Sequence, residues 1–207
     1  MKYAFPKTLL LATTNRKKIV ELRPPLEPLG FTLVDLSEMP DRITVEETGA
    51  TFIENARIKA TAQAMHYGQW AIGEDSGLCV PALQGKPGVF SARYAGLGAG
   101  DEANNDKLLE EMIDIKGEER GAYYVSTMCL AAPDGKIVVE SEGQCWGRIL
   151  HQRRGSGGFG YDPLFEIVEF QKTFAELDVT VKTAISHRGK AILQFKAELS
   201  QALSRFS

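Results

Sequence analysis

An uninterrupted apolar segment close to the N-terminus constrains the fold of this chain more than any other part of its sequence. Residues 8–13 (TLLLAT) lack the alternation of polar and apolar side chains that marks a strand with one face in water. The run is typical of a strand buried on both faces, and the polar residues 14–18 after it indicate the start of a helix. A buried strand followed directly by a helix is the pattern of an α/β protein.

The rest of the chain continues this pattern. Residues 51–65 place apolar and small side chains at helical spacing with charged residues between them, which predicts an amphipathic helix. Pro24, Pro25 and Pro28 predict that the first helix is short. Further helices are expected at about 102–115 and 186–206, and strands at 31–36, 70–73, 123–131, 136–140 and 164–167. Pro133-Asp134-Gly135 lies between the predicted strands 123–131 and 136–140, and this turn predicts that they form a hairpin.

Strands and helices alternate early while a hairpin occupies the middle, which predicts an α/β fold built on a long mixed β-sheet flanked by helices. At 207 residues the chain is expected to form a single domain, 1–207, with two lobes and a central cleft.

Composition narrows the class of protein. A net charge of −3 gives no polybasic signature, which argues against a nucleic-acid polymer or an anionic membrane as the main partner. The N-terminus lacks the pattern of a signal peptide, and no apolar run approaches membrane-spanning length, so we expect a cytoplasmic protein. Cys79, Cys129 and Cys145 are odd in number and far apart, which predicts free thiols.

Two pairs of acidic residues predict a metal site. Glu74 and Asp75 follow the apolar residues 70–73, and burying their charges costs several kcal/mol unless a cation or hydrogen-bond donors compensate. Glu46 and Glu47 precede the predicted helix 51–65, and a helix followed by a strand can return to the same sheet edge, where Mg²⁺ would bind. The alternatives are a solvated Ser-Gly turn and acids that complement a helix dipole.

Three further polar clusters suit a ligand, two of them through phosphate contacts and one through stacking. Residues 13–18 join a buried strand to a helix N-terminus, where free backbone N–H groups favour an anion, and residues 186–190 (SHRGK) open the last helix with three donors. In the Gly-rich residues 155–163, two aromatic rings and Asp162 offer stacking and hydrogen bonding. The alternatives are capped helix starts with solvated basic side chains and a packed turn.

Together these clusters occur as an ordered set of motifs: TTNRKK at 13–18, ETGATFIENA at 47–56, EDSGL at 74–78, PGVFSARYAG at 87–96, GGFGYDP at 157–163 and SHRG at 186–189. Each motif is weak alone, but in this order they resemble the inosine triphosphate pyrophosphatase family, over about residues 9–199. The family hydrolyses non-standard purine nucleoside triphosphates such as ITP, dITP and XTP to the monophosphate and pyrophosphate. The resemblance therefore implies that the central cleft binds a nucleotide.

The resemblance also implies residue roles. Asn15, Lys18 and Lys59 would contact the phosphates, Phe159 would stack on the purine, and Asp75 would be the general base. Mg²⁺, with Mn²⁺ as a substitute, would be held by Glu47 and by Glu74 or Asp75. The residues expected to bind substrate are Thr13, Thr14, Asn15, Arg16, Lys17, Lys18, Lys59, Ser76, Arg93, Phe159, Gly160, Tyr161, Asp162, Lys182, His187 and Arg188.

Within this set, Asp162, Lys182, His187 and Arg188 would surround the base and sugar, and His187 and Arg188 would read the purine oxygen. The resemblance further implies a homodimer. Two other functions stay open at this point: a pyrophosphatase of related fold acting on modified pyrimidine or methylated nucleotides, and a nucleotide-binding module without turnover.

Overall fold

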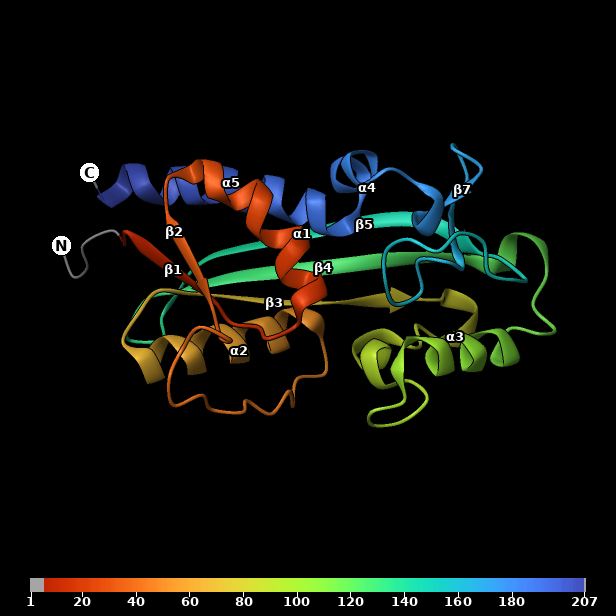
Figure 1. Cartoon of the computed structure of the whole chain (residues 1–207), viewed down its shortest axis with the longest axis horizontal. Helices are drawn as coiled ribbons and strands as arrows, with labels where there is room; N and C mark the ends of the chain where they lie inside the picture. Colours follow the sequence, from red (N-terminus) through yellow and green to blue (C-terminus); the bar gives the residue numbers. More distant parts are fainter. Residues whose placement is uncertain (1–5, 207) are drawn as a thin grey trace. The chain divides into compact units, whose positions relative to one another are not determined.

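A seven-stranded mixed β-sheet flanked by helices is the framework of this protein, as seen in a computed structural model that describes residues 6–206 (Figure 1). The strand order is β2-β1-β3-β4-β5-β6-β7. Strands β1, β2 and β3 pair in parallel, while β6 pairs antiparallel with both β5 and β7. The predicted fold class, a long mixed sheet with helices around it, is confirmed.

The strands are β1 Thr8–Leu11, β2 Thr32–Asp35, β3 Ala71–Cys79, β4 Gly121–Ala131, β5 Ile137–Ile149, β6 Phe165–Ile167 and β7 Lys172–Thr173. The α-helices are α1 Arg16–Leu26, α2 Phe52–Tyr67, α3 Gly100–Glu111, α4 Val179–Ile185 and α5 His187–Phe206. Each helix within residues 6–206 is too short or too polar to cross a bilayer.

The chain divides into two compact units. The first unit contains the residues up to Asp75, Ser126–Gly143 and the residues from Arg188 onward. The second unit contains Ser76–Val125 and Gln144–His187.

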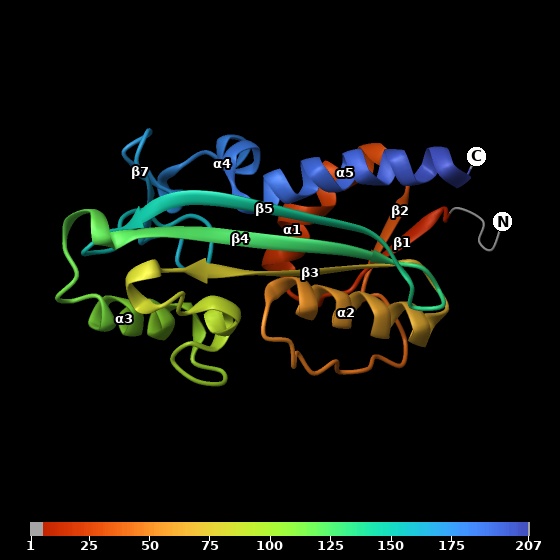
Figure 2. The same ribbon diagram turned by 180° about the vertical axis from the view of Figure 1, so that it is seen from behind.

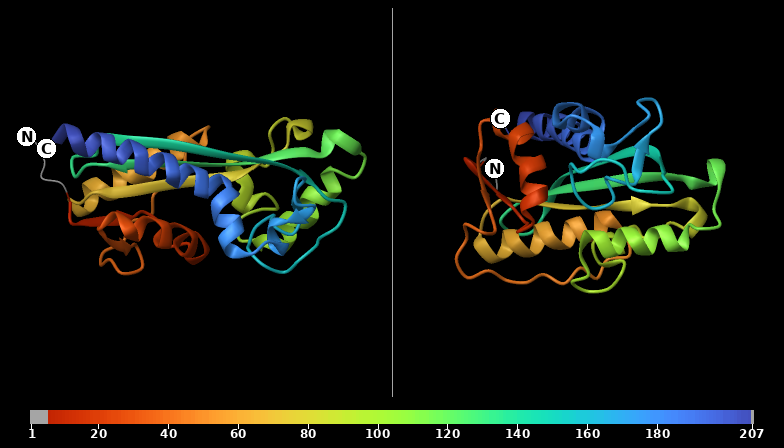
Figure 3. Two further views of the ribbon diagram at one scale, coloured as in Figure 1. Left: turned by 90° about the horizontal axis from the view of Figure 1, so that it is seen from above. Right: turned by 45° about the vertical axis from the view of Figure 1, so that its right-hand side comes forward.

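The first unit buries strand β1 on both faces, as the apolar run predicts. Leu9 and Leu11 belong to a core cluster with residues of α1 and α5, whereas Leu10 packs with Ala56, Ala60 and Ala64 of α2. Figure 1 and the view from behind in Figure 2 place α1 and α5 on one side of the strands and α2 on the other, and the right-hand view in Figure 3 agrees. The alternation of side chains along β1 therefore supplies two separate helix-packing faces.

The second unit has its own core. Leu108 and Met112, from α3 and the residue after it, pack with Tyr124 of β4 and with Phe165 and Phe174. The three cysteines, Cys79, Cys129 and Cys145, are free and buried, as predicted.

Four predictions about element length were wrong, those for α1, β3, β5 and α3. Helix α1 includes Pro24 and Pro25 and ends at Leu26. Both prolines lie near its last turn, and burial of Leu22 and Leu26 offsets the lost backbone hydrogen bonds, since one fully buried leucine contributes about 1.5–3 kcal/mol.

The strand expected at residues 70–73 continues to Cys79, so Glu74 and Asp75 lie inside β3 and the Ser-Gly turn does not form. Strand β5 likewise runs beyond residue 140 to Ile149. Helix α3 ends at Glu111, earlier than residue 115, and the short elements α4 and β7 were not predicted. The helices α2 and α5 and the strands β2, β4 and β6 lie where the pattern placed them.

Gly73 allows α2 to approach β3 closely, which generates a test of the packing. A Cβ at Gly73 would collide with the carbonyl oxygen of Ala56 and lie 2.7 Å from the backbone nitrogen of Ala60. We predict that Gly73→Ala lowers the free energy of unfolding by about 3 kcal/mol, the upper range for overpacking. Gly68→Ala, at an open left-handed helix cap, should cost only about 1 kcal/mol. Urea unfolding measures both, and equal losses would contradict the packing argument.

Candidate active site

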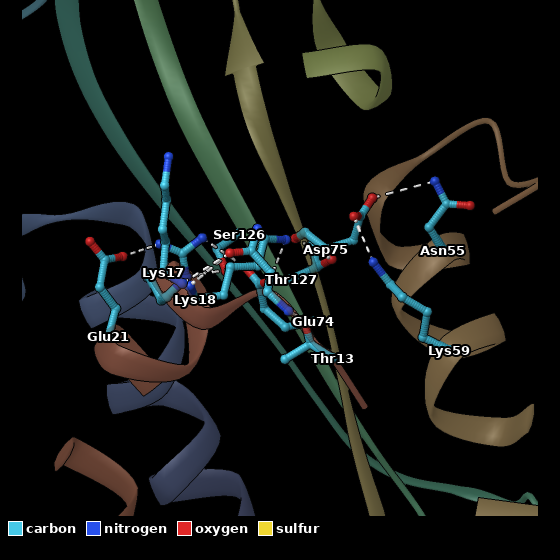
Figure 4. A network of polar contacts seen from close by, with 12 residues as sticks. Thr13, Lys17, Lys18, Glu21, Asn55, Lys59, Glu74, Asp75, Ser126 and Thr127 are labelled. Carbon is cyan, nitrogen blue, oxygen red and sulfur yellow. Dashed lines mark hydrogen bonds and ion pairs between the residues drawn. The ribbon is translucent and has the colours of Figure 1, made fainter. Parts of the chain in front are cut away.

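Glu74 and Asp75 send their carboxylates to opposite faces of strand β3. Successive side chains of a strand alternate between its two faces, and Figure 4 shows Glu74 turned toward Lys18 and Asp75 turned toward Lys59. The two adjacent acids therefore have different ionic partners: Lys18 and Arg188 pair with Glu74, and Lys59 pairs with Asp75.

The Glu74 carboxylate is buried among positive charges. Its oxygens lie 2.7 Å from Lys18 Nζ and 3.2 Å from an Arg188 guanidinium nitrogen, and Ser126 Oγ donates a hydrogen bond to it at 2.9 Å. Burial raises the pKa of Glu74, but Lys18 and Arg188 outweigh burial and hold this pKa well below its usual range. Arg188 also pairs with Glu21 of α1. At neutral pH Glu74 is therefore an ionised partner of two basic side chains.

The Asp75 carboxylate is also buried, with weaker compensation. Lys59 Nζ lies 2.8 Å from Oδ1, and Asn55 Nδ2 donates to Oδ2 at 3.3 Å. Burial raises the pKa of Asp75, and Lys59 offsets this effect only in part. A carboxylate whose pKa is raised by burial is a stronger base once ionised, which suits a general base.

Lys59 joins Asp75 to the loop before α2. Its Nζ lies 3.4 Å from a Glu47 carboxylate oxygen as well as 2.8 Å from Asp75. Burial lowers the pKa of Lys59, but the two carboxylates outweigh burial and the pKa is raised. Glu47 and Asp75 thus both contact the Lys59 ammonium group. The sequence predicted that these acids would come together. Glu46, next to Glu47, is exposed.

The residues at 13–18 form a capped helix start. Asn15 Oδ1 accepts hydrogen bonds from the backbone N–H groups of Lys17 and Lys18, and Thr13 Oγ1 accepts from the N–H of Asn15. Thr14, Asn15, Arg16 and Lys17 are exposed. The predicted helix cap is confirmed, whereas phosphate binding by these residues stays a prediction.

In the second unit, the Asp162 side chain forms hydrogen bonds that hold the Gly-rich segment to α4. Its Oδ2 accepts from the backbone N–H of Phe159 at 2.8 Å and from Lys182 Nζ at 2.6 Å. Lys182 Nζ also lies 5.2 Å from the centre of the Phe159 ring. A Cβ at Gly158 would collide with the Asp162 carboxylate, so only glycine fits there. Three of the predicted base-binding residues therefore do meet.

His187 and Tyr161 are held by Tyr124 in the same unit. The His187 ring stacks on the Tyr124 ring, with centroids 4.6 Å apart and planes at 10°, and Tyr124 Oη accepts from the backbone N–H of Tyr161. Tyr161 itself is buried and its hydroxyl donates to the carbonyl of Ser91, which makes its ring part of the core.

The remaining predicted residues have varied settings. Gly160 is fixed by hydrogen bonds from its N–H to Asp101 and from Asn105 to its carbonyl. Ser76 follows Asp75 in β3 and is half-buried, and the Arg93 guanidinium lies 5.2 Å from the centre of the Phe90 ring.

Glu47 and Asp75 are the residues that could bind a metal ion in this site. Two carboxylates that already share one ammonium group have the charge and proximity to share a divalent cation. Among residues 6–206, no three acidic, histidine or cysteine side chains cluster as a complete metal cage. Mg²⁺ does not need such a cage, because it is usually bound by one or two carboxylates together with substrate phosphates and water. The donor set therefore fits Mg²⁺.

Sequence reasoning missed several members of these clusters, among them Asn55, Ser126, Tyr124 and Glu21. Asn55 carried the clearest signal, because it is a polar residue one helical turn before Lys59 and next to the apolar stripe that begins at Ala56. Ser126 lies within an otherwise apolar strand. Nothing in their local patterns names the carboxylate that each one contacts.

Comparison with known proteins identifies the class of protein. A dITP/XTP pyrophosphatase of Rhodopirellula baltica is 51% identical over 191 residues, covering 92% of each chain. One of Thermus thermophilus is 50% identical over 184 residues, covering 89% of this chain and 87% of its own. The structure of the Staphylococcus aureus Ham1 protein matches with a TM-score of 0.84 at 37% identity, covering 94% of this chain and 98% of the other.

The sequence model of the Ham1 family matches residues 9–198. The chain belongs to the Ham1 family.

The charge cluster around Glu74 predicts a pH-dependent contribution to stability. Glu74→Gln should lower the free energy of unfolding at pH 7 by about 3–5 kcal/mol, because it leaves Lys18 and the buried Arg188 without their shared carboxylate. Since the folded pKa of Glu74 is lowered, this contribution is fully present above the unfolded value, about 4.3, and is lost as the pH falls toward the folded value.

Urea unfolding of the wild type and the variant from pH 7 to pH 3 measures this difference, which should narrow only below about pH 4.3. A difference that stays constant over this range would mean that Glu74 contributes by shape and not by charge.

Proposed function

We propose that this protein hydrolyses non-standard purine nucleoside triphosphates (ITP, dITP and XTP) to the monophosphate and pyrophosphate. The observation that carries the proposal is the buried Asp75, whose raised pKa suits a general base and whose oxygens are held by Lys59 and Asn55. The relatives named dITP/XTP pyrophosphatase support the choice of substrate.

Glu47 and Asp75 are the residues that we assign to Mg²⁺, because both already lie against the Lys59 ammonium group. Glu74 is not assigned, since its carboxylate lies on the other face of β3 and is neutralised by Lys18 and Arg188. Bound Mg²⁺ would supply positive charge to the triphosphate oxygens.

The protein's own residues account for the rest of the reaction. A triphosphate carries about four negative charges at neutral pH, and Lys18, Lys59 and the N-terminus of α1 offset them. Asp75 takes a proton from water as the water oxygen bonds to the α-phosphorus. The bond from the α-phosphorus to the bridging oxygen then breaks, and pyrophosphate leaves with that oxygen.

The purine is assigned to the cluster of the second unit. Phe159 offers a ring for stacking, and His187 and the backbone N–H groups of the Gly-rich segment offer donors for a 6-oxo group. A 6-amino group would leave such donors unpaired. Arg188 is reassigned from the base to the support of Glu74, because its guanidinium pairs with Glu74 and Glu21. The homodimer, which the family resemblance implies, and the cytoplasmic location, which the lack of a signal-peptide pattern implies, both stay predictions.

The first test of this function identifies the bond that is broken. If water attacks the α-phosphorus, ITP should give IMP and pyrophosphate without IDP, and free phosphate should appear only after inorganic pyrophosphatase is added. Chromatography of the nucleotides, with a phosphate assay in parallel, measures both. Accumulation of IDP would refute the assignment, and ATP serves as the control nucleotide that should react slowly.

The second test concerns the general base. Asp75→Asn should lower kcat by at least about 10²-fold, the usual scale for a positioned base, while nucleotide binding largely survives. Steady-state kinetics and equilibrium binding of ITP measure the two effects. Glu46→Gln, which alters an exposed acid beside Glu47, is the control and should keep its kcat. An Asp75→Asn enzyme with near wild-type kcat would transfer the role to another acid.

The third test separates stacking from recognition of the purine oxygen. His187→Ala should cost roughly 1–3 kcal/mol in kcat/KM for ITP and much less for ATP, because only ITP carries the 6-oxo group. Phe159→Ala should weaken all purines similarly, by roughly 1–3 kcal/mol, because every purine has a face to stack. Measurement of kcat/KM for ITP, XTP, GTP and ATP decides. Equal losses on ITP and ATP for His187→Ala would show that this side chain does not select the base.

A further inference from the structure

Asn55 is a fully buried side chain that links Asp75 to the backbone at Gly49, two residues after Glu47. Its Oδ1 accepts a hydrogen bond from the backbone N–H of Gly49 at 2.8 Å, and its Nδ2 donates to Asp75 Oδ2 at 3.3 Å. A buried amide must satisfy both ends. The chemistry of the partners fixes its orientation, because a backbone N–H needs an oxygen and a carboxylate needs a donor.

The segment that follows Glu47 packs closely against the Asn55 side chain at Gly49. A Cβ at Gly49 would lie 2.7 Å from Asn55 Oδ1 and 2.7 Å from Glu54 Cβ, so only glycine allows the contact. The following residues, Ala50 and Thr51, donate their backbone N–H groups to Glu54 Oε2. The chain just after Glu47 is therefore held to the first turn of α2.

Asn55 and Lys59 contact Asp75 in different ways. They are one helical turn apart on α2 and reach different oxygens of the same carboxylate, Oδ2 and Oδ1 (Figure 4). Lys59 supplies charge through a long side chain with many rotamers, whereas the short Asn55 side chain has both ends fixed. Lys59 therefore neutralises Asp75 at Oδ1, while Asn55 fixes the direction of Oδ2.

We propose that Asn55 is a positioning residue that holds the Asp75 carboxylate and the Glu47 segment in the mutual arrangement that catalysis requires. The inference rests on the proposed function, in which Asp75 takes the proton and Glu47 and Asp75 hold the metal. Loss of the Asn55 amide removes the donor that orients Asp75 and leaves the Gly49 N–H without its acceptor. Asp75 and the segment that carries Glu47 are then no longer held in a fixed arrangement.

The first arm of the test compares Asn55→Ala with Gln63→Ala. Gln63 is a matched control, because it is also buried in α2 and donates a hydrogen bond to the Ile43 carbonyl in the loop before α2. The side chains of α2 that bind Asp75 are Asn55 and Lys59, so Gln63→Ala leaves those contacts in place. Asn55→Ala should lower kcat for ITP by about 10–100-fold, the usual scale for residues that orient metal ligands, with a much smaller change in KM. Gln63→Ala should lower the thermal midpoint without this loss of kcat.

A second arm uses the close contact at Gly49. Gly49→Ala pushes on Asn55 Oδ1 and should reproduce the loss of kcat, although Asp75 is untouched. In the double variant Gly49→Ala/Asn55→Ala the two losses should not multiply, because both act through one amide. Asn55→Asp keeps the acceptor for Gly49 but places a carboxylate against Asp75, so it should lose at least as much kcat as Asn55→Ala. If Asn55→Ala does not fold, Asn55→Asp carries the comparison.

A third arm does not depend on turnover. Mn²⁺ binding to the nucleotide-free enzyme, followed by electron paramagnetic resonance, should weaken by about 10–100-fold in Asn55→Ala and stay near wild type in Gln63→Ala. A wild-type enzyme that binds Mn²⁺ but does not hydrolyse ITP would refute the proposed function and leave this readout of Asn55 intact. Wild-type kcat and Mn²⁺ affinity in the Asn55 variants, or equal losses in Gln63→Ala, would overturn the inference.

Discussion

The alternation of side chains along strand β3 is the constraint on which the candidate site depends. Because neighbouring residues of a strand face opposite ways, the side chains of Glu74 and Asp75 leave β3 on opposite faces and contact different helices. Helices α1 and α5 supply basic partners to Glu74, and α2 supplies Lys59 and Asn55 to Asp75. A pair of acids that looks like one motif in the sequence is thus divided between two helical layers.

This division gives two adjacent carboxylates opposite electrostatic properties. Glu74 is neutralised by Lys18 and Arg188, so its pKa is lowered and it stays charged. Asp75 has Lys59 as its close cation and its pKa is raised by burial, so its carboxylate is a stronger base than that of an ordinary aspartate. One acid contributes to structure and the other to chemistry because their neighbours differ.

Much of the fold was predictable, because helix α2 and the buried strand β1 carry strong local patterns. The length of β3 was not predictable, because two adjacent acids after an apolar run normally mark the end of a strand. The basic side chains that allow Glu74 to be buried, Lys18 and Arg188, are distant in sequence, so the local pattern does not reveal them. The motif order predicted which residues matter, but it did not predict their pairing. Asn55 was missed because an amide inside a helix does not reveal its partner, which lies in another element.

The ion-pair cluster of the half-buried Lys18 with the buried Glu74 and Arg188 makes this part of the protein sensitive to temperature. Hydration of charged groups becomes less favourable as temperature rises, so the cost of burying these charges falls on heating. The penalty for burying this cluster is therefore smaller at high temperature than at room temperature, so its net contribution to the folded state should rise on heating.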